Sequence, residues 1–284
     1  MILVTGSTGR VGGEIVRQLA AMGSRVRAFV RGGPEDAKGL PHGVEIAYGD
    51  LDKPETVAPA MQGVEKVYLL VPGTPAMPKQ EGAALEAAKR AGVKHIVKHS
   101  VMGARNPEIA IARLHRASET AIETSGIAWT FVRPGSFMSN ALDWAMPIKT
   151  QGGVFQPLGD GRVAMVDPRD IAAVGVAALT KPGHEGKAYD VTGPEALDMN
   201  QHVAILSEVL GKPLRYVNIP EAATRDMMLN KVGMPAPVVE GLLEVFARIR
   251  DGKASHVSND VETVTGKPAR RFKEWVLENK AAFQ

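Results

Sequence analysis

The 284 residues of the chain are 44% hydrophobic and 23% charged, a composition typical of a folded globular protein, which excludes a largely disordered chain. The absence of cysteine excludes disulfide bonds, thiolate catalysis and cysteine-ligated metals. The net charge of +3 comes from 34 basic and 31 acidic residues mixed along the sequence. We therefore expect no nucleic-acid partner and, without an apolar run of about 20 residues, no membrane partner.

The amino-terminal stretch predicts a strand, a glycine-rich turn and a helix. An apolar run over 2–4 leads into glycines with GxxGxxG spacing, and apolar residues then recur with helical period up to Gly23. Glycines in such a turn let the backbone approach a pyrophosphate, and the helix N-terminus attracts its negative charge. The pattern favours a dinucleotide site over an ordinary tight turn, with contacts from Gly6, Thr8, Gly9, Arg10, Val11 and Gly12.

Strands and helices alternate in the segment that follows. Such alternation indicates a Rossmann-type α/β fold with a doubly wound parallel sheet, whose ligands bind at the carboxyl ends of the strands. Because the first strand begins at residue 2, we expect no cleavable signal and a cytoplasmic protein. The predicted strands cover 25–31, 44–48, 67–71, 95–100 and 129–133, and the predicted helices cover 54–62, 79–91 and 108–124.

The alternation ends at Gly135, and most of the remaining chain is predicted to be helical. An irregular segment over 136–165 precedes a helix with Pro168 in its first turn, and a seventh strand follows over 189–192. Later helices are predicted over 199–210, 221–231 and 238–250 and from Phe272 onward. We therefore predict a dinucleotide-binding domain of 1–135 with 166–195, and a small, mostly helical substrate-binding lobe of 136–165 with 196–284.

The end of the second strand indicates which dinucleotide binds. NAD-selective folds place an acidic residue there, whereas this chain has Arg31. A guanidinium suits the 2′-phosphate of NADP, and Arg10 can close on the same group. We therefore predict NADP (NADPH) as the cofactor, with NAD as the alternative if Arg31 is only a solvated charge.

Further cofactor contacts are predicted where later strands end. Asp50 is expected to accept a hydrogen bond from the adenine amine, and Leu51 to cover the ring. The turn after the fourth strand is expected along the ribose and nicotinamide, although Pro-Gly is also an ordinary turn sequence. The residues expected there and at the ends of the next two strands are Val71, Pro72, Ser100 and Pro134.

The glycine turn and the alternation resemble the short-chain dehydrogenase superfamily, whose usual proton donor is the tyrosine of a Tyr-x-x-x-Lys motif. That motif is absent. Tyr48, Tyr68, Tyr189 and Tyr216 are followed four positions later by Asp52, Pro72, Gly193 and Pro220.

The helix over 108–124 instead carries His115 and Glu119, which are four residues apart and share one face. This pair, followed by Gly-Ile-Ala-Trp-Thr-Phe-Val-Arg-Pro-Gly over 126–135, resembles the NmrA-like branch of atypical short-chain dehydrogenases. That branch includes NAD(P)H:quinone oxidoreductases and triphenylmethane- and azo-dye reductases. The likeness continues over 166–172, 189–195, 206–211 and 265–272.

The resemblance implies an NADPH-dependent reductase that transfers hydride to a quinone or another electron-poor aromatic acceptor. Such acceptors need no strong carbonyl-polarising acid, so positioning carries much of the rate. We expect His115 to titrate near pH 7 and to donate a proton while Glu119 orients it. The alternative is a surface His–Glu pair. Ser100 is expected to bind the nicotinamide amide or a substrate oxygen, unless it is an ordinary polar strand end.

An apolar wall for a flat acceptor is expected after the sixth strand, from Phe137, Met138 and Trp144, unless these residues are only core. The expected partner is therefore a small aromatic molecule, bound by a monomer or homodimer, and no metal site is predicted. Two other functions stay open. One is a non-catalytic NADP-binding redox sensor, and the other is a reductase of a small carbonyl or imine metabolite.

Overall fold

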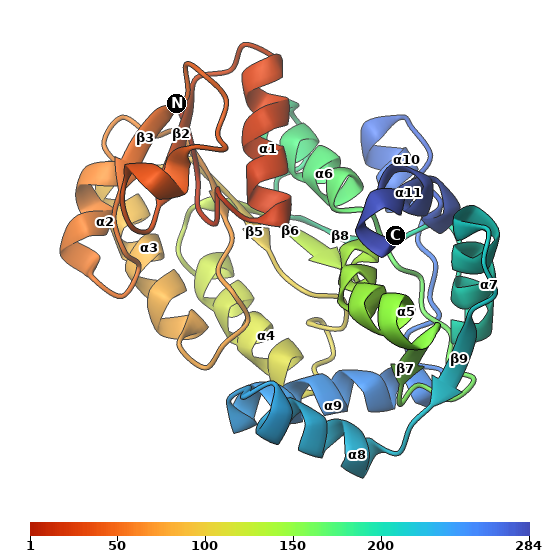
Figure 1. The fold of residues 1–284 in the computed structure, drawn as a ribbon. Coiled ribbons are helices and arrows are strands. Elements are labelled where there is room, and N and C mark those ends of the chain that lie inside the picture. The colour runs from red at the N-terminus through yellow and green to blue at the C-terminus, as the bar shows by residue number, and fades with distance from the viewer. The chain divides into compact units, whose positions relative to one another are not determined.

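Seven parallel strands form the sheet of the first structural unit in this computed structural model, which describes residues 1–284 (Figure 1). Their order across the sheet is β3-β2-β1-β4-β5-β6-β8, so the chain reverses its direction across the sheet between β1 and β4. The predicted Rossmann-type sheet is confirmed. The strands are β1 (Ile2–Val4), β2 (Val26–Val30), β3 (Glu45–Tyr48), β4 (Lys66–Leu69), β5 (His95–His99), β6 (Ala128–Pro134) and β8 (Lys187–Val191).

Helices cover both faces of this sheet (Figure 1). One face carries α1 (Arg10–Ala21) and α6 (Pro168–Thr180), which pack against each other. The other face carries α2 (Pro54–Ala60), α3 (Met77–Ala91) and α4 (Ala110–Glu123), and a short 3-10 turn, η1 (Pro34–Ala37), follows β2. Because both faces are covered, polar strand residues are enclosed along with apolar ones, and every residue of β5 is buried.

The second unit is mostly helical but also contains a two-stranded parallel sheet. Sequence periodicity predicts an irregular segment over 136–165, and this prediction is wrong because that segment contains η2, α5 and β7. The two strands of the small sheet are four residues each, too short for a clear period-two pattern. The elements of the second unit are η2 (Met138–Trp144), α5 (Ala145–Gln151), β7 (Gly153–Gln156), α7 (Met199–Leu210), β9 (Arg215–Asn218), α8 (Glu221–Asp226), the π-helical η3 (Met227–Lys231), α9 (Ala236–Arg250), α11 (Phe272–Glu278) and η4 (Lys280–Phe283).

Each of the two units is built from three separate segments of the chain. The first unit consists of Met1–Pro134, Pro168–Val191 and Thr263–Gly266. The second consists of Gly135–Asp167, Thr192–Glu262 and Lys267–Gln284, and helix α10 (Asp260–Thr265) spans a boundary. Residues 263–266 thus group with the first unit, whereas the sequence places them in the substrate-binding lobe.

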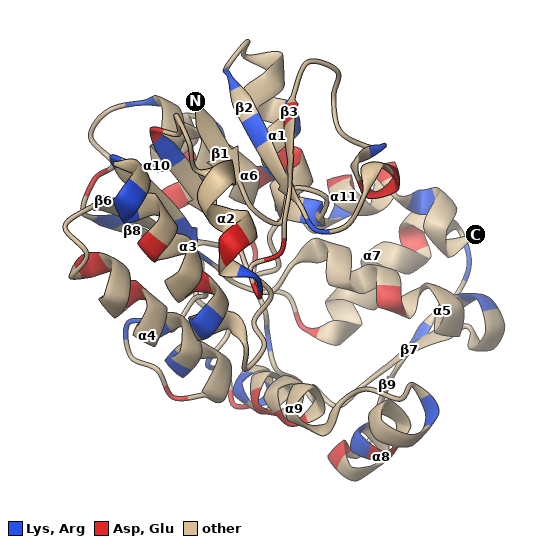
Figure 2. Ribbon diagram, turned by 90° about the vertical axis from the view of Figure 1, so that its left-hand side faces the viewer, with Lys and Arg blue, Asp and Glu red and all other residues tan.

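Each unit has its own apolar core. In the first unit, buried residues of the sheet such as Leu3, Val67 and Phe131 pack with the helices beneath them. In the second, Trp144, Phe272 and Trp275 belong to one cluster. Basic and acidic residues are scattered over both units (Figure 2). No helix combines the length and hydropathy needed to cross a membrane.

Candidate functional site

The turn between β1 and α1 leaves no room for side chains at two of its glycines. Gly6 has φ 62°, and a Cβ there would lie 2.7 Å from Cδ2 of Leu70. A Cβ at Gly12 would lie 2.1 Å from the carbonyl oxygen of Gly6, so only glycine lets α1 start this close to the turn. The two glycines therefore let the turn pack tightly against β4 and against the start of α1.

Two buried hydroxyls fix this turn to neighbouring strands. Oγ1 of Thr5 donates to the carbonyl of Leu70 at 2.8 Å and accepts from the amide of Leu70 at 2.8 Å. Oγ of Ser7 donates to the carbonyl of Phe29 at 2.8 Å. Sequence reasoning missed both residues, although a polar residue enclosed between glycines at the end of a buried strand is a usable signal. The turn is thus held in place before any ligand binds.

The start of α1 carries the positive end of a helix of twelve residues. Its N-cap, Gly9, offers no side-chain acceptor, and the first turn contains no acidic residue. Thr8 and Arg10 are exposed, whereas the side chain of Val11 is buried in the core, so Val11 offers only its backbone to a ligand. The geometry fits the pyrophosphate of a dinucleotide.

The predicted contacts to the adenosine half lie at the ends of β2 and β3. Arg31 is exposed directly after β2, before the turn at Gly32. Asp50 is half-buried, and its Oδ1 accepts a hydrogen bond from the amide of Asp52 at 3.0 Å, which shapes the loop. Leu51 is half-buried against the core of the first unit. An adenine contact by Asp50 and Leu51 stays a prediction.

The loop after β4 lies against helix α4. Val71 is buried and Pro72 is exposed. A Cβ at Gly73 would lie 2.2 Å from Cδ1 of Ile111 and 3.7 Å from Nε2 of His115. Since β1 and β4 flank the point where the strand order reverses, His115 presents Nε2 beside the place where such folds bind ligands.

His115 is a buried, neutral imidazole. Burial and then the charge of Lys98 lower the pKa of His115 to about 2. The expectation that His115 titrates near pH 7 is therefore wrong, because its helix faces the interior rather than solvent. Nδ1 of His115 lies 3.4 Å from Nζ of Lys98. An ammonium has no lone pair, so Nδ1 accepts and the ring proton resides on Nε2.

Lys98 and Glu81 form a buried ion pair that sequence reasoning missed. Nζ of Lys98 contacts the two carboxylate oxygens of Glu81 at 2.6 and 2.7 Å. Burial lowers the pKa of the Lys98 ammonium, and the Glu81 carboxylate opposes that shift. The usable signal was the sequence of β5, since a lysine inside a strand that is covered on both faces must be paired. We call Glu81, Lys98 and His115 the Lys98 cluster.

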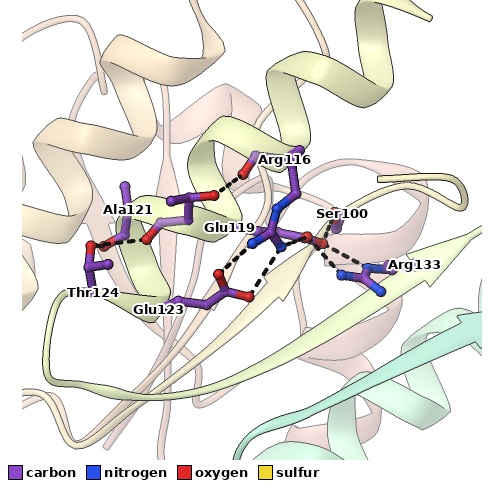
Figure 3. A network of polar contacts seen from close by, with 8 residues as sticks. Ser100, Arg116, Glu119, Ala121, Glu123, Thr124 and Arg133 are labelled. Atoms are coloured by element: carbon purple, nitrogen blue, oxygen red, sulfur yellow. Dashed lines mark hydrogen bonds and ion pairs between the residues drawn. The ribbon is translucent and has the colours of Figure 1, made fainter. Parts of the chain in front are cut away.

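Glu119 does not orient His115. Its carboxylate accepts from Nε and Nη2 of Arg133 at 2.9 and 2.8 Å and from Oγ of Ser100 at 2.7 Å (Figure 3). Nη1 of Arg116 also donates to Glu119, at 2.9 Å, and binds Glu123. We call these five residues the Glu119 cluster.

The Glu119 cluster keeps its central carboxylate charged. Burial raises the pKa of Glu119, but the hydrogen bonds from Arg133 and Ser100 outweigh it and lower the pKa below its usual value. Ser100 is buried and donates its only hydroxyl proton to this carboxylate, so its oxygen can contact a ligand only as an acceptor. Ser100 and Glu119 therefore bind each other in this arrangement, and the contact of Ser100 with the nicotinamide amide stays a prediction. Pro134 is buried, and its carbonyl accepts from the amide of Met102.

Tyr68 and His99 lie on the other face of the sheet, beneath α6. The hydroxyl of Tyr68 is 3.0 Å from Nδ1 of His99, and Gly175 of α6 has no side chain where the tyrosine ring packs. Burial raises the pKa of Tyr68 and lowers the pKa of His99 to about 3. Both groups are therefore neutral at pH 7 and face away from the Lys98 cluster.

The predicted apolar wall divides into core and half-buried positions. Met138 and Trp144 are 0% and 6% exposed and belong to the core of the second unit, as the alternative interpretation held. Their side chains are enclosed, and their substrate-binding role stays a prediction. Phe137 is half-buried, and its backbone bridges to Val166.

The sequence profile of the NmrA-like family matches residues 1–276. The chain belongs to the NmrA-like family. The predicted family is confirmed, and the replacement of the usual Tyr-x-x-x-Lys by other residues on α4 is consistent with this branch. As an NmrA-like protein, the chain is expected to share a fold with relatives along its whole length.

Full-length similarity extends to proteins with named activities. The chain is 45% identical over 285 residues to the (4-alkanoyl-5-oxo-2,5-dihydrofuran-3-yl)methyl phosphate reductase of Streptomyces griseus, covering 100% of this chain and 99% of that protein. It is 41% identical over 284 residues to the NAD(P)H azoreductase of Xenophilus azovorans, with the same coverage. The NADPH-dependent quinone oxidoreductase of Escherichia coli, solved with NADPH, matches with a TM-score of 0.89 at 29% identity and covers 99% of this chain and 100% of that chain.

Proposed function

We propose that this NmrA-like protein is an NADPH-dependent reductase that transfers hydride to a quinone or a related electron-poor aromatic acceptor such as an azo dye. The observation that carries the proposal is the placement of Nε2 of His115 beside the loop after β4, at the point where the strand order reverses. Full-length similarity to reductases that use NADPH or NAD(P)H supports it.

The residues of the first unit fit NADP. Gly12 lets α1 begin against the backbone of Gly6, which leaves the amides at the start of the helix to face a pyrophosphate, and the first turn of α1 holds no acidic residue to repel it. Arg31, supported by Arg10, would bind the 2′-phosphate, and Asp50 with Leu51 would hold the adenine. Val71 and Pro72 would lie along the ribose and nicotinamide. When bound, NADPH supplies the hydride.

The neutral imidazole of His115 suits a quinone acceptor. One hydride and one proton convert a quinone to a hydroquinone, and negative charge develops on a quinone oxygen as the hydride arrives. A neutral imidazole N–H can stabilise such an oxygen by hydrogen bonding without losing its proton. Solvent then supplies the proton to the released phenolate. Phe137 is the residue of the predicted apolar wall that stays a candidate for acceptor contact.

The test is NADPH oxidation by purified protein with a panel of quinones and azo dyes. We expect turnover with NADPH and a lower rate with NADH. The negative control is Gly12→Val, which should weaken NADPH binding by about tenfold or more because the new side chain collides with the carbonyl of Gly6. Gly82→Val is its matched control, since nothing lies within 4 Å of a Cβ at Gly82. Absence of turnover with every acceptor contradicts the proposal.

A second candidate is reduction of a small conjugated carbonyl compound that carries a phosphate group. It is favoured by the 45% identity to the furanyl methyl phosphate reductase. A preference for a phosphorylated butenolide over every quinone in the panel would support it.

The third candidate is a redox sensor, for which tight NADP binding without turnover is the expected result.

We further propose that the protein acts in the cytoplasm as a monomer or homodimer on small molecules alone. Light scattering of the purified protein, with and without NADPH, tests the oligomeric state.

A further inference from the structure

We propose that Lys98, held by Glu81, is a positioning residue that fixes His115 as an Nε2–H hydrogen-bond donor toward the acceptor. This inference rests on the proposed reductase function and adds to it a residue pair outside the cofactor contacts.

The contacts of Lys98 leave one assignment for the histidine ring. Its ammonium has three protons, and its neighbours are the two Glu81 oxygens, the carbonyl of His99 at 3.3 Å and Nδ1 of His115 at 3.4 Å. The three oxygens are acceptors, and a proton on Nδ1 would point at the positive ammonium, which is unfavourable. Nδ1 therefore carries no proton, and the ring proton lies on Nε2, on the side of Gly73.

The charge of Lys98 also strengthens the donor. A cation at Nδ1 polarises the imidazole, and hydrogen bonds in a chain reinforce one another in a medium of low dielectric constant. Glu81 neutralises the cation on its other side, which keeps Lys98 charged although its side chain is fully buried. An apolar residue would fill the same space without the cost of desolvating an ion pair, so a role beyond packing explains its presence.

The chemistry of the acceptor separates this role from a structural one. A quinone oxygen gains negative charge when hydride arrives and benefits from the His115 donor. A cationic triphenylmethane dye becomes neutral on accepting hydride at its central carbon, and no oxyanion forms. Loss of the donor should therefore slow quinone reduction and leave reduction of the cationic dye unchanged.

The experiment compares Lys98→Met with Lys66→Met. Lys66 is the matched control because it also lies on a strand of the sheet, but its ammonium donates to the carbonyl of Leu179, away from His115. We expect kcat for menadione to fall about tenfold in Lys98→Met, because His115 loses both its fixed tautomer and the cation that polarises its Nε2–H donor. We expect kcat for the cationic dye and KM for NADPH to stay within about twofold. Lys98→Arg should restore part of the quinone rate.

A spectroscopic readout tests the same point without any acceptor. The ¹⁵N chemical shifts of His115 should show the Nε2–H tautomer in the wild-type protein and in Lys66→Met, and a mixture of tautomers in Lys98→Met. If Lys98→Met does not fold because Glu81 is left unpaired, the double variant Lys98→Met, Glu81→Met is used in its place, since it removes both charges.

An unchanged tautomer, or an equal loss of rate on both acceptors in a folded variant, overturns the inference. A wild-type protein that reduces no acceptor contradicts the proposed function instead, and the nitrogen shifts still decide the role of Lys98.

Discussion

His115 of the Lys98 cluster and Glu119 of the Glu119 cluster lie one helical turn apart on α4, and each cluster encloses charged groups in the first unit. In the Glu119 cluster the carboxylate is surrounded by donors from Ser100, Arg116 and Arg133, and its interactions connect α4 to β5 and β6 (Figure 3). In the Lys98 cluster the chain of contacts ends at Nε2 of His115, which faces the loop at Gly73. A cluster whose donors are all used internally stabilises the fold, whereas one that presents a donor at its edge is suited to chemistry.

The largest expected effect is on stability, in the Glu119 cluster. Glu119→Gln should lower the free energy of unfolding by about 3 kcal/mol, because it leaves the buried guanidinium of Arg133 without its charged partner. The quinone kcat of the remaining folded protein should stay close to that of the wild type. Urea unfolding and turnover on the same samples measure both quantities. A large loss of kcat in fully folded Glu119→Gln would contradict the assignment of stability to the Glu119 cluster and of activity to the Lys98 cluster.

The second largest effect is expected on the rate, in the Lys98 cluster. His115→Gln should lower kcat for a quinone by about a hundredfold, the lower end of the range for a lost hydrogen-bond donor to a developing oxyanion. Its free energy of unfolding should change by less than that of Glu119→Gln, since an amide also accepts from Lys98. Steady-state kinetics and urea unfolding provide the comparison, and unaltered quinone turnover would remove His115 from the site.

The pH dependence separates activity from stability. Because His115 has a pKa of about 2 in the folded protein, it stays neutral and kcat should show no inflection from this residue between pH 6 and 8. In the unfolded chain its pKa is about 6.5. The unfolded state thus binds more protons near and below that pH, so the free energy of unfolding falls as pH falls, by about 1 kcal/mol between pH 6.5 and 5.5 for this histidine. Unfolding curves at pH 6.5 and 5.5 for the wild type and His115→Gln measure this contribution.

The smallest effect is expected at the solvent side of the Glu119 cluster. The Arg116 side chain is 30% exposed and pairs with both Glu119 and Glu123. Arg116→Ala should lower the free energy of unfolding by about 1 kcal/mol or less, because solvent screens a partly exposed pair. A loss as large as that of Glu119→Gln would show that the outer arginine, rather than Arg133, holds the carboxylate.

The parts of the fold that depend on short-range patterns could be predicted from the sequence. The glycine spacing from Gly6 to Gly12 and the strand-helix alternation are local signals, and both describe the first unit correctly. The strands β7 and β9 could not be predicted, because each becomes a strand only through pairing with a partner about 60 residues away.

The site was only partly predictable for the same reason. The spacing of His115 and Glu119 shows that they share a helix face. It does not show that His115 contacts Lys98 of β5 whereas Glu119 binds Arg133 of β6. Glu81 lies on an alanine-rich helix and gives no sign of its contact with Lys98. Pairings of this kind depend on tertiary packing, which also sets the pKa of His115.

The hydroxyl of Thr5 connects residues that are 65 positions apart in the sequence. The glycine turn therefore depends on the pairing of β4 with β1, a contact between residues far apart in the sequence, and is not a property of the first strand-turn-helix segment alone. A ligand that binds this turn recognises the assembled sheet and, by mass action, holds β1, β2 and β4 together. NADPH should consequently act as a folding ligand whose saturation protects the amides of all three strands from hydrogen exchange.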